Sequence, residues 1–195
     1  MDWKDSLKII SKEIDNGYFS FKSLKELLED YDTKLEAVYE KLRTTEKARA
    51  FFQVQAENTQ REVSETLSVI ITSALKSVFP DDYECVIEFT GSGAKLYLKK
   101  GEDIIEDPIN SVGGGVIDIA SFAARVAFIF LSGSSRTLIA DEPFKAVSSD
   151  LRVKIPEMLQ LLSEKLGVQF IIVSHLQEII EGADNVVFIK DGSVL

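Results

Sequence analysis

Two adjacent carboxylates, Asp141 and Glu142, stand at the end of an apolar run and are followed by Pro143. A short apolar run between serine- and glycine-rich residues and a proline predicts a buried strand, most simply in a parallel sheet. The carboxyl ends of such strands form the edge where α/β sheets bind ligands. Neighbouring side chains at a strand end point in different directions, so we expect Asp141 to reach a hydrated Mg²⁺ and Glu142 to orient and deprotonate a water. The alternative is a solvated acidic turn.

The only histidine, His175, follows a second apolar run over Val168–Val173. A histidine at that strand end can sense or stabilise a γ-phosphate, because its charge changes near neutral pH. A lone histidine without this context is more commonly a capping or core residue.

Three consecutive glycines, Gly113–Gly115, open a helix that is predicted to run through Phe130. Glycine lets the backbone approach an anion closely, and the N–H groups and dipole of a helix N-terminus favour phosphate. A flexible loop is the alternative. The helix is apolar on nearly all sides, so we expect it to be buried. Asp118 and Arg125 interrupt this surface, either as ion-pair partners or at a contact with ATP or a partner.

In this order, the glycine-opened helix, the strand ending in Asp-Glu-Pro and the strand ending in Ser-His resemble the C-terminal half of an ABC-type ATPase head. The SMC-like and SbcC-like ATPases of DNA repair and recombination are the most similar. The resemblance covers roughly residues 60 to 195. It implies an α/β fold with a mostly parallel sheet and helices, preceded by a long helical or coiled-coil segment. We therefore expect a helical arm over residues 1–79 and an ABC-type C-terminal lobe over residues 80–195.

The resemblance also implies a role for each motif. Glu142 would be the catalytic base, His175 the γ-phosphate sensor of the His switch, and Asp141 the Mg²⁺ ligand of the Walker B motif. The signature segment would close on the ATP that a second protomer holds, so chemistry would need two copies of each lobe. The residues expected to contact ATP are Ser111, Val112, Gly113, Gly114, Gly115, Asp118 and Ser148.

Three departures from the family pattern bear on this expectation. Val112 takes the place of the signature serine, and Ser148 takes that of the aspartate in the loop after Asp-Glu-Pro. The sequence also has no Gly-x-x-x-x-Gly-Lys-Ser/Thr loop, and Gly91–Lys95, which lacks its spacing, predicts a hairpin turn instead. We therefore expect no ATP binding or hydrolysis by this chain alone. ATP and Mg²⁺ would bind in a site completed by a Walker A lobe from another chain or from a segment outside this sequence.

The N-terminal region predicts helices. Residues 1–16 predict a short amphipathic helix that ends at Asn16-Gly17. From Phe19 to Phe79 there is no proline or glycine, and a seven-residue apolar pattern predicts a coiled coil. The apolar stripe must be buried on a folded-back helix of this chain, on a second copy or on another protein. The last two possibilities would give a homo- or hetero-oligomer through residues 20–79. The seam positions are Phe21, Leu28, Leu35, Leu42, Arg49, Ala56, Val63 and Ile70, and Leu24, Tyr31, Val38, Thr45, Phe52, Thr59 and Thr66.

The remaining segments predict alternating strands and helices. Ser149 or Asp150 is expected to cap the helix after the acidic motif, in which Pro156 implies a kink or a later start. The predicted elements are a helix over Glu65–Val78, a hairpin of Tyr83–Phe89 and Lys95–Lys99, a loop over Gly101–Pro108, helices over Leu151–Leu166 and His175–Ile180, and strands over Val168–Val173 and Asn185–Ile189.

The 195-residue chain carries a formal net charge of −10, which repels DNA phosphates. DNA contact is therefore expected only indirectly, or through the basic cluster of Lys41, Arg43, Lys47 and Arg49, which is more simply a solvated helix face. A single cysteine, Cys85, excludes an internal disulfide. Because the sequence has no signal peptide and no membrane-spanning run, we expect a cytoplasmic protein that does not bind a membrane.

Two functions remain open. The first is the C-terminal half of an SMC-like ATPase of DNA repair or recombination, active only with its Walker A lobe. The second is a non-catalytic module that docks on an intact SMC-like ATPase and inhibits or redirects it. A structural coiled-coil protein with a degenerate head is a weaker third.

Overall fold

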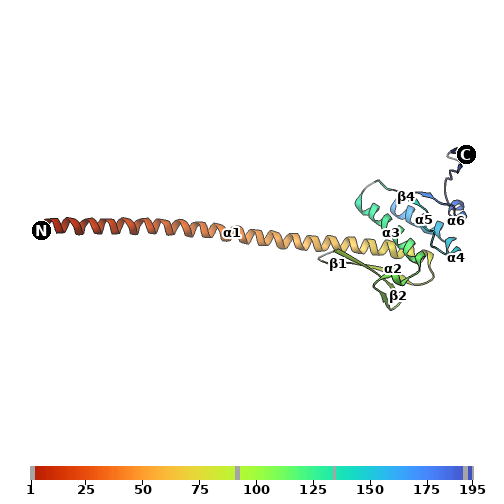
Figure 1. Cartoon of the computed structure of the whole chain (residues 1–195), viewed down its shortest axis with the longest axis horizontal. Coiled ribbons are helices and arrows are strands. Elements are labelled where there is room, and N and C mark those ends of the chain that lie inside the picture. Colours follow the sequence, from red (N-terminus) through yellow and green to blue (C-terminus); the bar gives the residue numbers. More distant parts are fainter. Residues whose placement is uncertain (1–2, 91–92, 134, 191–192, 195) are drawn as a thin grey trace. The chain divides into compact units, whose positions relative to one another are not determined.

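The computed structural model describes residues 3–90, 93–133, 135–190 and 193–194 (Figure 1). Gly91 and Ser92, where a hairpin turn is predicted, lie outside these residues. The chain divides into two compact units, Met1–Glu57 and Asn58–Leu195. In chain order the elements are α1 (Trp3–Val78), β1 (Tyr83–Thr90), β2 (Gly93–Lys100), β3 (Asp103–Ile105), α2 (Pro108–Ser111), α3 (Gly114–Ser132), β4 (Thr137–Asp141), α4 (Ser149–Arg152), α5 (Ile155–Leu166), β5 (Gln169–Val173), α6 (Gln177–Glu181), β6 (Ile189–Lys190) and β7 (Ser193–Val194).

The first unit is the N-terminal part of α1, and the helix end predicted at Asn16-Gly17 is wrong. A glycine in a helix interior costs about 1 kcal/mol. This cost is smaller than the gain from continuing the helix, because each residue added to an existing helix forms a further backbone hydrogen bond. The helix also does not fold back on itself, so the hairpin considered for this arm does not form within α1. Between Gly17 and the end of α1 at Val78 there is no glycine or proline that could turn the helix.

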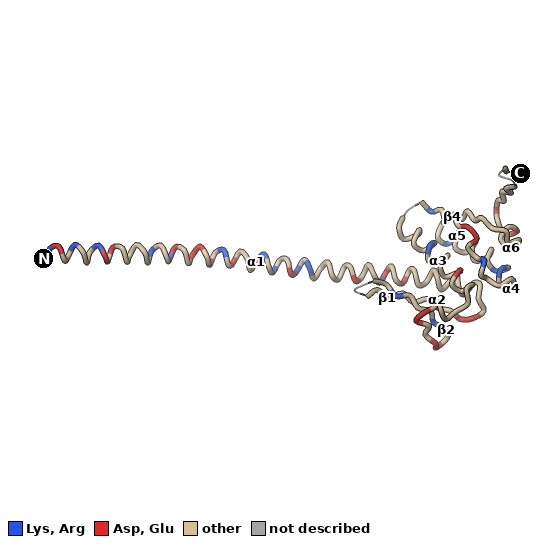
Figure 2. The backbone as a smooth tube through the Cα atoms, in the orientation of Figure 1, with Lys and Arg blue, Asp and Glu red and all other residues tan. Residues whose placement is uncertain are grey.

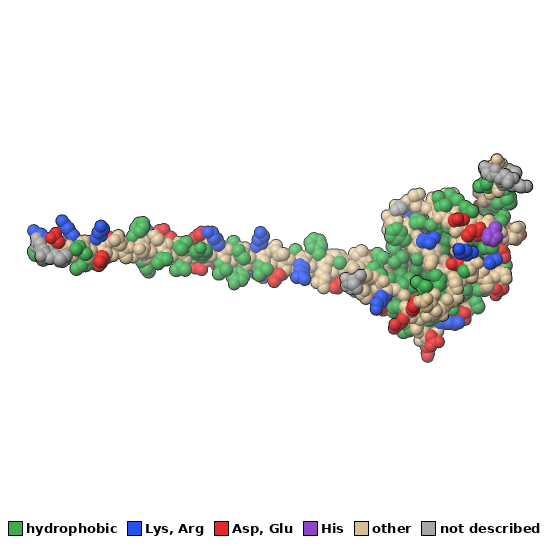
Figure 3. Space-filling model, in the orientation of Figure 1, with side chains coloured by type: hydrophobic (Ala, Val, Ile, Leu, Met, Phe, Trp, Pro, Cys, Tyr) green, Lys and Arg blue, Asp and Glu red, His purple; other side chains and the backbone are tan. Residues whose placement is uncertain are grey.

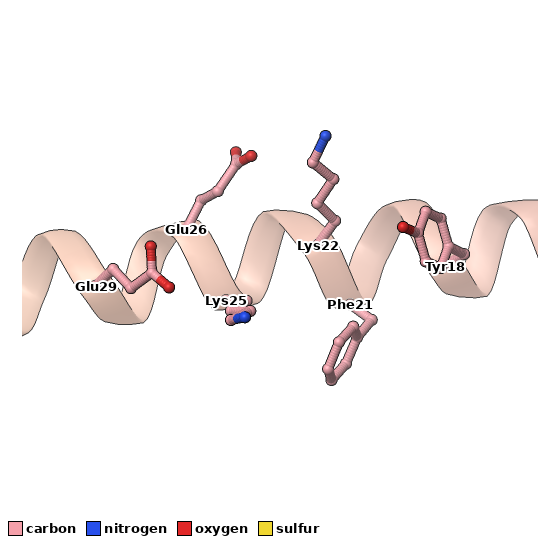
Figure 4. Close-up of a pocket in the computed structure, with 6 residues that line it drawn as sticks. All are labelled: Tyr18, Phe21, Lys22, Lys25, Glu26 and Glu29. Atoms are coloured by element: carbon pink, nitrogen blue, oxygen red, sulfur yellow. The ribbon is translucent and has the colours of Figure 1, made fainter.

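The continuous helix extends the predicted seam toward the N-terminus. Leu7 and Ile14 lie at multiples of seven residues from Phe21, and Ile10 stands in the same relation to Leu24. These side chains are all exposed, and Figure 3 shows hydrophobic side chains along the surface of α1. The shallow depression drawn in Figure 4 is formed by neighbouring turns of this one helix, from Tyr18 to Glu29, and has no opposing wall.

Acidic and basic residues are interspersed along α1, as the colours of the backbone in Figure 2 show. Each residue turns about 100° around a helix, so Lys41 and Arg43 point to nearly opposite sides. The basic cluster of the sequence therefore does not form one face of the helix, as expected for solvated side chains.

The second unit contains a three-stranded antiparallel sheet of order β1-β2-β3. Tyr83 pairs with Lys100 and Thr90 with Gly93, which confirms the predicted hairpin and lengthens both strands. The loop predicted over Gly101–Pro108 is only partly correct. A turn at Gly101, with a φ of 61°, returns the chain to pair β3 with the end of β2, and α2 then begins at Pro108.

The last turns of α1 pack on this sheet. Ile71, Ala74 and Leu75 are fully buried. The helix predicted over Glu65–Val78 is thus the end of α1, and this end of the predicted oligomer segment 20–79 is used in the chain's own core. Three hydroxyls of α1, four residues apart, also bind the backbone of β1: Thr72 Oγ1 accepts from Cys85 N at 2.9 Å, Ser68 Oγ accepts from Ile87 N at 3.2 Å, and the Ser64 hydroxyl donates to Ile87 O.

Helix α3 is buried on one face only, which corrects the expectation of burial all round. Ile119, Ala123 and Val126 are fully buried, whereas Phe128 is 70% exposed. By length and composition α3 could cross a membrane, a test that helices packed in a protein core also pass. Its exposed side is mixed, with Ser121 and Arg125 beside the apolar Phe128 and Leu131.

Strands β4 and β5 form a separate parallel pair. β4 was expected to be buried, but Ile139 is 71% exposed and only Leu138 and Ala140 point into the core. The strand predicted over Asn185–Ile189 is wrong. Only Ile189–Lys190 is extended there, as β6 paired with the short β7.

The single helix predicted over Leu151–Leu166 is two helices, and the first of them, α4, starts at Ser149, two residues earlier than predicted. The N-cap of α4 is Ser148, not Ser149 or Asp150, and it makes no side-chain cap hydrogen bond. The predicted later start at Pro156 is confirmed, because proline lacks the N–H that a helix interior needs and α5 begins one residue before it. Gly167 ends α5 in the left-handed conformation, as predicted.

The hydroxyl contacts of α1 predict a stability difference between two threonines of the same helix. Thr72→Val should lower the free energy of unfolding by about 1–3 kcal/mol, because it leaves the Cys85 amide without its acceptor. Thr66→Val is the matched control, since the Thr66 hydroxyl binds the Glu62 carbonyl of its own helix, and it should change stability by less than about 0.5 kcal/mol. Denaturant unfolding measures both, and equal losses would contradict the role of the hydroxyls.

Candidate functional site

The parallel pairing of β4 with β5 brings the acidic motif to the histidine. Asp141 pairs with Val173 at the carboxyl ends of the two strands. One residue further on, the Glu142 amide donates to the Val173 carbonyl at 2.9 Å. The residues that follow the two strands therefore meet at one edge of the sheet, as the sequence predicts.

Glu142 and His175 are in contact at this edge. Glu142 Oε1 lies 2.8 Å from His175 Nδ1, and the Glu142 side chain is 30% exposed while that of His175 is 77% exposed. With the proton on Nδ1, the imidazole donates to the carboxylate. The other oxygen, Glu142 Oε2, is buried and has no hydrogen-bond partner among the described residues. A buried acceptor without a partner is costly, which marks this atom as a place for a ligand or a water.

The backbone of Glu142 is also strained. Its φ of 46° is the only positive value of a non-glycine residue in the described part of the chain. Such a conformation costs on the order of 1–3 kcal/mol, and it persists where the surroundings impose it. Here the Val173 carbonyl holds the Glu142 amide on one side, and the buried Phe144 ring anchors the chain two residues later.

Asp141 ends β4 with an exposed side chain. The described residues contain no group of three or more His, Cys, Asp or Glu side chains that could hold a metal ion. One carboxylate fits Mg²⁺, which keeps several waters and takes further oxygens from a bound phosphate. Asp141 and the unpaired Glu142 Oε2 therefore fit part of a site for Mg²⁺ and a nucleotide, and the remaining groups of that site would come from elsewhere.

The glycine segment forms the N-terminus of α3. Gly113 is the N-cap with a φ of −64° and a ψ of 149°, and α3 begins at Gly114, as predicted. The first N–H groups of a helix have no partner within it and carry its positive dipole end. Ser111 ends α2 with an exposed side chain. Val112, which was predicted to stand at the place of the signature serine, packs partly buried against the core.

Two of the three glycines are needed for close packing inside the chain. A Cβ on Gly115 would lie 3.1 Å from both Ala146 O and Val147 Cα, and one on Gly114 would lie 3.1 Å from Ala146 Cβ. A Cβ on Gly113 would meet nothing within 4 Å. Close backbone approach therefore accounts for Gly114 and Gly115, and only Gly113 is open toward a ligand.

The loop that approaches these glycines is 143–148, and several side chains hold it. The Ala146 amide donates to Asp118 Oδ2 at 2.9 Å. Arg152 Nε donates to Val147 O at 2.9 Å. Phe144 is fully buried, with its ring 4.8 Å from that of Phe122. Neither Phe144 nor Arg152 was predicted from the sequence, although a large apolar residue directly after Asp-Glu-Pro is a signal that could have indicated an anchored loop.

The predicted site residues thus fall into two groups. Glu142, His175 and Asp141 gather at the carboxyl edge of β4 and β5. Gly114, Gly115 and Asp118 contact loop 143–148, and Ser148 caps α4 at the end of that loop. Within the described ranges no hydrogen bond or ion pair joins Ser111–Gly115 to Glu142 or His175.

Comparisons with known proteins support the resemblance. The "DNA double-strand break repair Rad50 ATPase" of Archaeoglobus fulgidus is 27% identical over 165 residues, which cover 79% of this chain and 17% of that protein. The chain therefore spans about a sixth of the relative's length. No protein-family model matches the chain.

Two solved structures share the fold. The Smc head domain of Pyrococcus furiosus, with an extended coiled coil and bound to the C-terminal domain of ScpA, aligns with a TM-score of 0.58 and 18% identity over 97% of this chain and 50% of that one. A structure from work on "ATP-driven dimerization and DNA stimulated activation of SMC ATPases" gives a TM-score of 0.54 and 16% identity, over 71% of this chain and 86% of that one. The predicted similarity to the C-terminal part of an SMC/Rad50-like head with a coiled coil is confirmed.

The packing of Gly115 predicts a sharp contrast with Gly113. Gly115→Ala should destabilise the chain by about 1–2 kcal/mol, because loop 143–148 is held on both sides and cannot move away, and this outweighs the better helix propensity of alanine. Gly113→Ala should cost less than about 1 kcal/mol, since its backbone angles suit alanine and its surroundings are open. Thermal unfolding of both variants tests this, and a Gly115→Ala variant as stable as the parent would refute the close approach.

Proposed function

We propose that this chain, which is similar to the C-terminal part of an SMC/Rad50-like ATPase head, completes an ATP-hydrolysing site with a Walker A lobe from another chain or from a segment outside this sequence. The observation that carries the proposal is the Glu142–His175 pair at the carboxyl edge of β4 and β5, with Glu142 Oε2 buried and unpaired. We further propose a role in DNA repair or recombination, after the Rad50 relative.

Glu142 is suited to accept a proton from water. His175 occupies Oε1 and orients the carboxylate, which leaves Oε2 as the oxygen that can accept. Mg²⁺ and ATP, when bound, supply the phosphoryl group and neutralise its charge. Asp141 would hold the metal from the end of β4, and the open face of His175 would meet the phosphate.

The glycine segment would act on a second protomer. Gly113 is open and is the N-cap of α3, so the first amides of the helix are placed to meet an anion. The Ser111 hydroxyl is exposed one residue before the half-buried Val112, and we propose that Ser111 takes the place of the signature serine. Ser148, exposed at the N-cap of α4, would contribute from the loop after the acids.

The uncovered face of the β4–β5 pair supports a missing lobe. Ile139 and its partner Ile171 are 71% and 48% exposed, and Val173 beside them is 58% exposed. Parallel strands are normally covered on both faces, and a two-stranded sheet is marginal by itself. Here α3 covers only the face of Leu138 and Ala140, so a further lobe has a place to pack.

A second function uses the same surfaces without catalysis. A chain with an exposed helix seam and an uncovered sheet face could dock on an intact SMC-like ATPase and inhibit or redirect it. The observation that favours this alternative is the exposed apolar face of Ile139, Ile171 and Val173, which can bind a partner without ATP.

Mutation of the proposed base separates the two functions. The chain alone should show no binding of Mg-ATP by calorimetry. Co-purified with a Walker A lobe, it should release phosphate from ATP, and Glu142→Gln should lower kcat by about a hundredfold or more while ATP binding remains.

An inhibitory module would instead reduce the activity of an intact SMC-like ATPase equally with or without the Glu142→Gln change. Tight Mg-ATP binding and turnover by the isolated chain would overturn the half-site proposal, because the phosphate cradle would then lie within these residues.

A further inference from the structure

We propose that Asp118 is a positioning residue that fastens the loop after Glu142 to the glycine end of α3, and that it does not bind the nucleotide. Its effect on catalysis rests on the proposed function, whereas the fastening itself is a property of this chain alone. The juxtaposition that carries the inference is Asp118 Oδ2 at 2.9 Å from the Ala146 amide, beside the two glycines on which the same loop rests.

Asp118 is engaged within the chain. It lies one turn into α3, where its half-buried side chain accepts a hydrogen bond from the backbone four residues after Glu142. A hydrogen bond to a carboxylate is shorter and stronger than one between neutral groups. The sequence left open an ion pair or a nucleotide contact for this residue, and the structure assigns its carboxylate to a backbone amide instead.

The hydrogen bond acts together with close packing. A Cβ at Gly115 would lie 3.1 Å from Ala146 O and Val147 Cα, so the loop is packed closely against α3 and has little room to move toward it. The Asp118 carboxylate opposes movement away from it. Loop and helix N-terminus are therefore constrained in both directions and move as one body.

The far side of the loop is held as well. Arg152 donates from Nε to Val147 O at 2.9 Å and from Nη2 to Lys145 O at 3.5 Å. Between Glu142 and the fastened Ala146 lie three residues, of which Phe144 is fully buried. A shift of α3 at its glycine end is thus passed through a short, anchored segment to the strained backbone of Glu142.

Asparagine separates this role from a nucleotide contact. Asp118→Asn keeps a side-chain oxygen that can accept from the Ala146 amide but removes the negative charge. Asp118→Ala removes both. A fastening role predicts that Asn largely replaces Asp, whereas a role for the charge at a metal or a bound cation predicts that Asn fails as Ala does.

The first measurement needs no nucleotide. Hydrogen exchange of the Ala146 amide in the purified chain should speed up by about tenfold or more in Asp118→Ala and by less than about threefold in Asp118→Asn. Glu65→Gln, which removes an exposed acid of α1, is the control for charge and should leave exchange at Ala146 unchanged. Unchanged exchange at Ala146 in Asp118→Ala would overturn the proposal.

The second measurement uses the chain completed with a Walker A lobe. Asp118→Ala should lower kcat by about tenfold with KM for ATP within about twofold of the parent, and Asp118→Asn should recover most of the rate. Loss of activity in both variants, with Ala146 still protected in the asparagine variant, would overturn the proposal in favour of a charge contact. A parent complex that releases no phosphate would refute the proposed function, and the exchange experiment would still decide on the fastening.

Discussion

The pairing of β4 with β5 is the constraint on which the candidate site depends. Both strands run in the same direction and in register, so the residues after Asp141 and after Val173 leave the sheet at the same edge. Without that pairing, Glu142 and His175 would be separated by the helices between them. The hydrogen bond from the Glu142 amide to the Val173 carbonyl helps to hold Glu142 in its strained backbone conformation. In this conformation one carboxylate oxygen meets His175 and the other has no partner among the described residues.

Much of this site could be predicted from the sequence. The apolar runs before Asp141 and His175 have the length of strands, and the polar residues directly after them are brought together by any parallel pairing. Membership in a head-like fold followed from the order of the motifs, and the similarity to a Rad50 ATPase agrees with it. The glycines at the start of α3 were also correctly placed, although two of the three serve packing against Ala146 and Val147.

Other features depend on contacts that no local pattern encodes. The continuity of α1 through Gly17 reflects cooperative helix formation on both sides, which outweighs the local stop signal of Asn16-Gly17. β3 forms because β2 offers an edge after the Gly101 turn, since a run of three residues is too short to predict a strand even though two of them are isoleucines. The hydrogen bond between Asp118 and Ala146 joins residues 28 positions apart, and its donor is a backbone N–H, which every residue type except proline carries.

The row of hydroxyls at the end of α1 has a mechanical consequence. The hydrophobic effect at a helix–sheet contact is not directional, whereas hydrogen bonds to fixed backbone groups are. Ser64, Ser68 and Thr72 bind the backbone of Cys85 and Ile87, two residues of β1 whose side chains are buried, so a shift of the helix along the strand would break these bonds. These hydrogen bonds therefore fix both the rotation of the helix end and its position along β1. A twist applied to the last turns of α1 is transmitted to the antiparallel sheet.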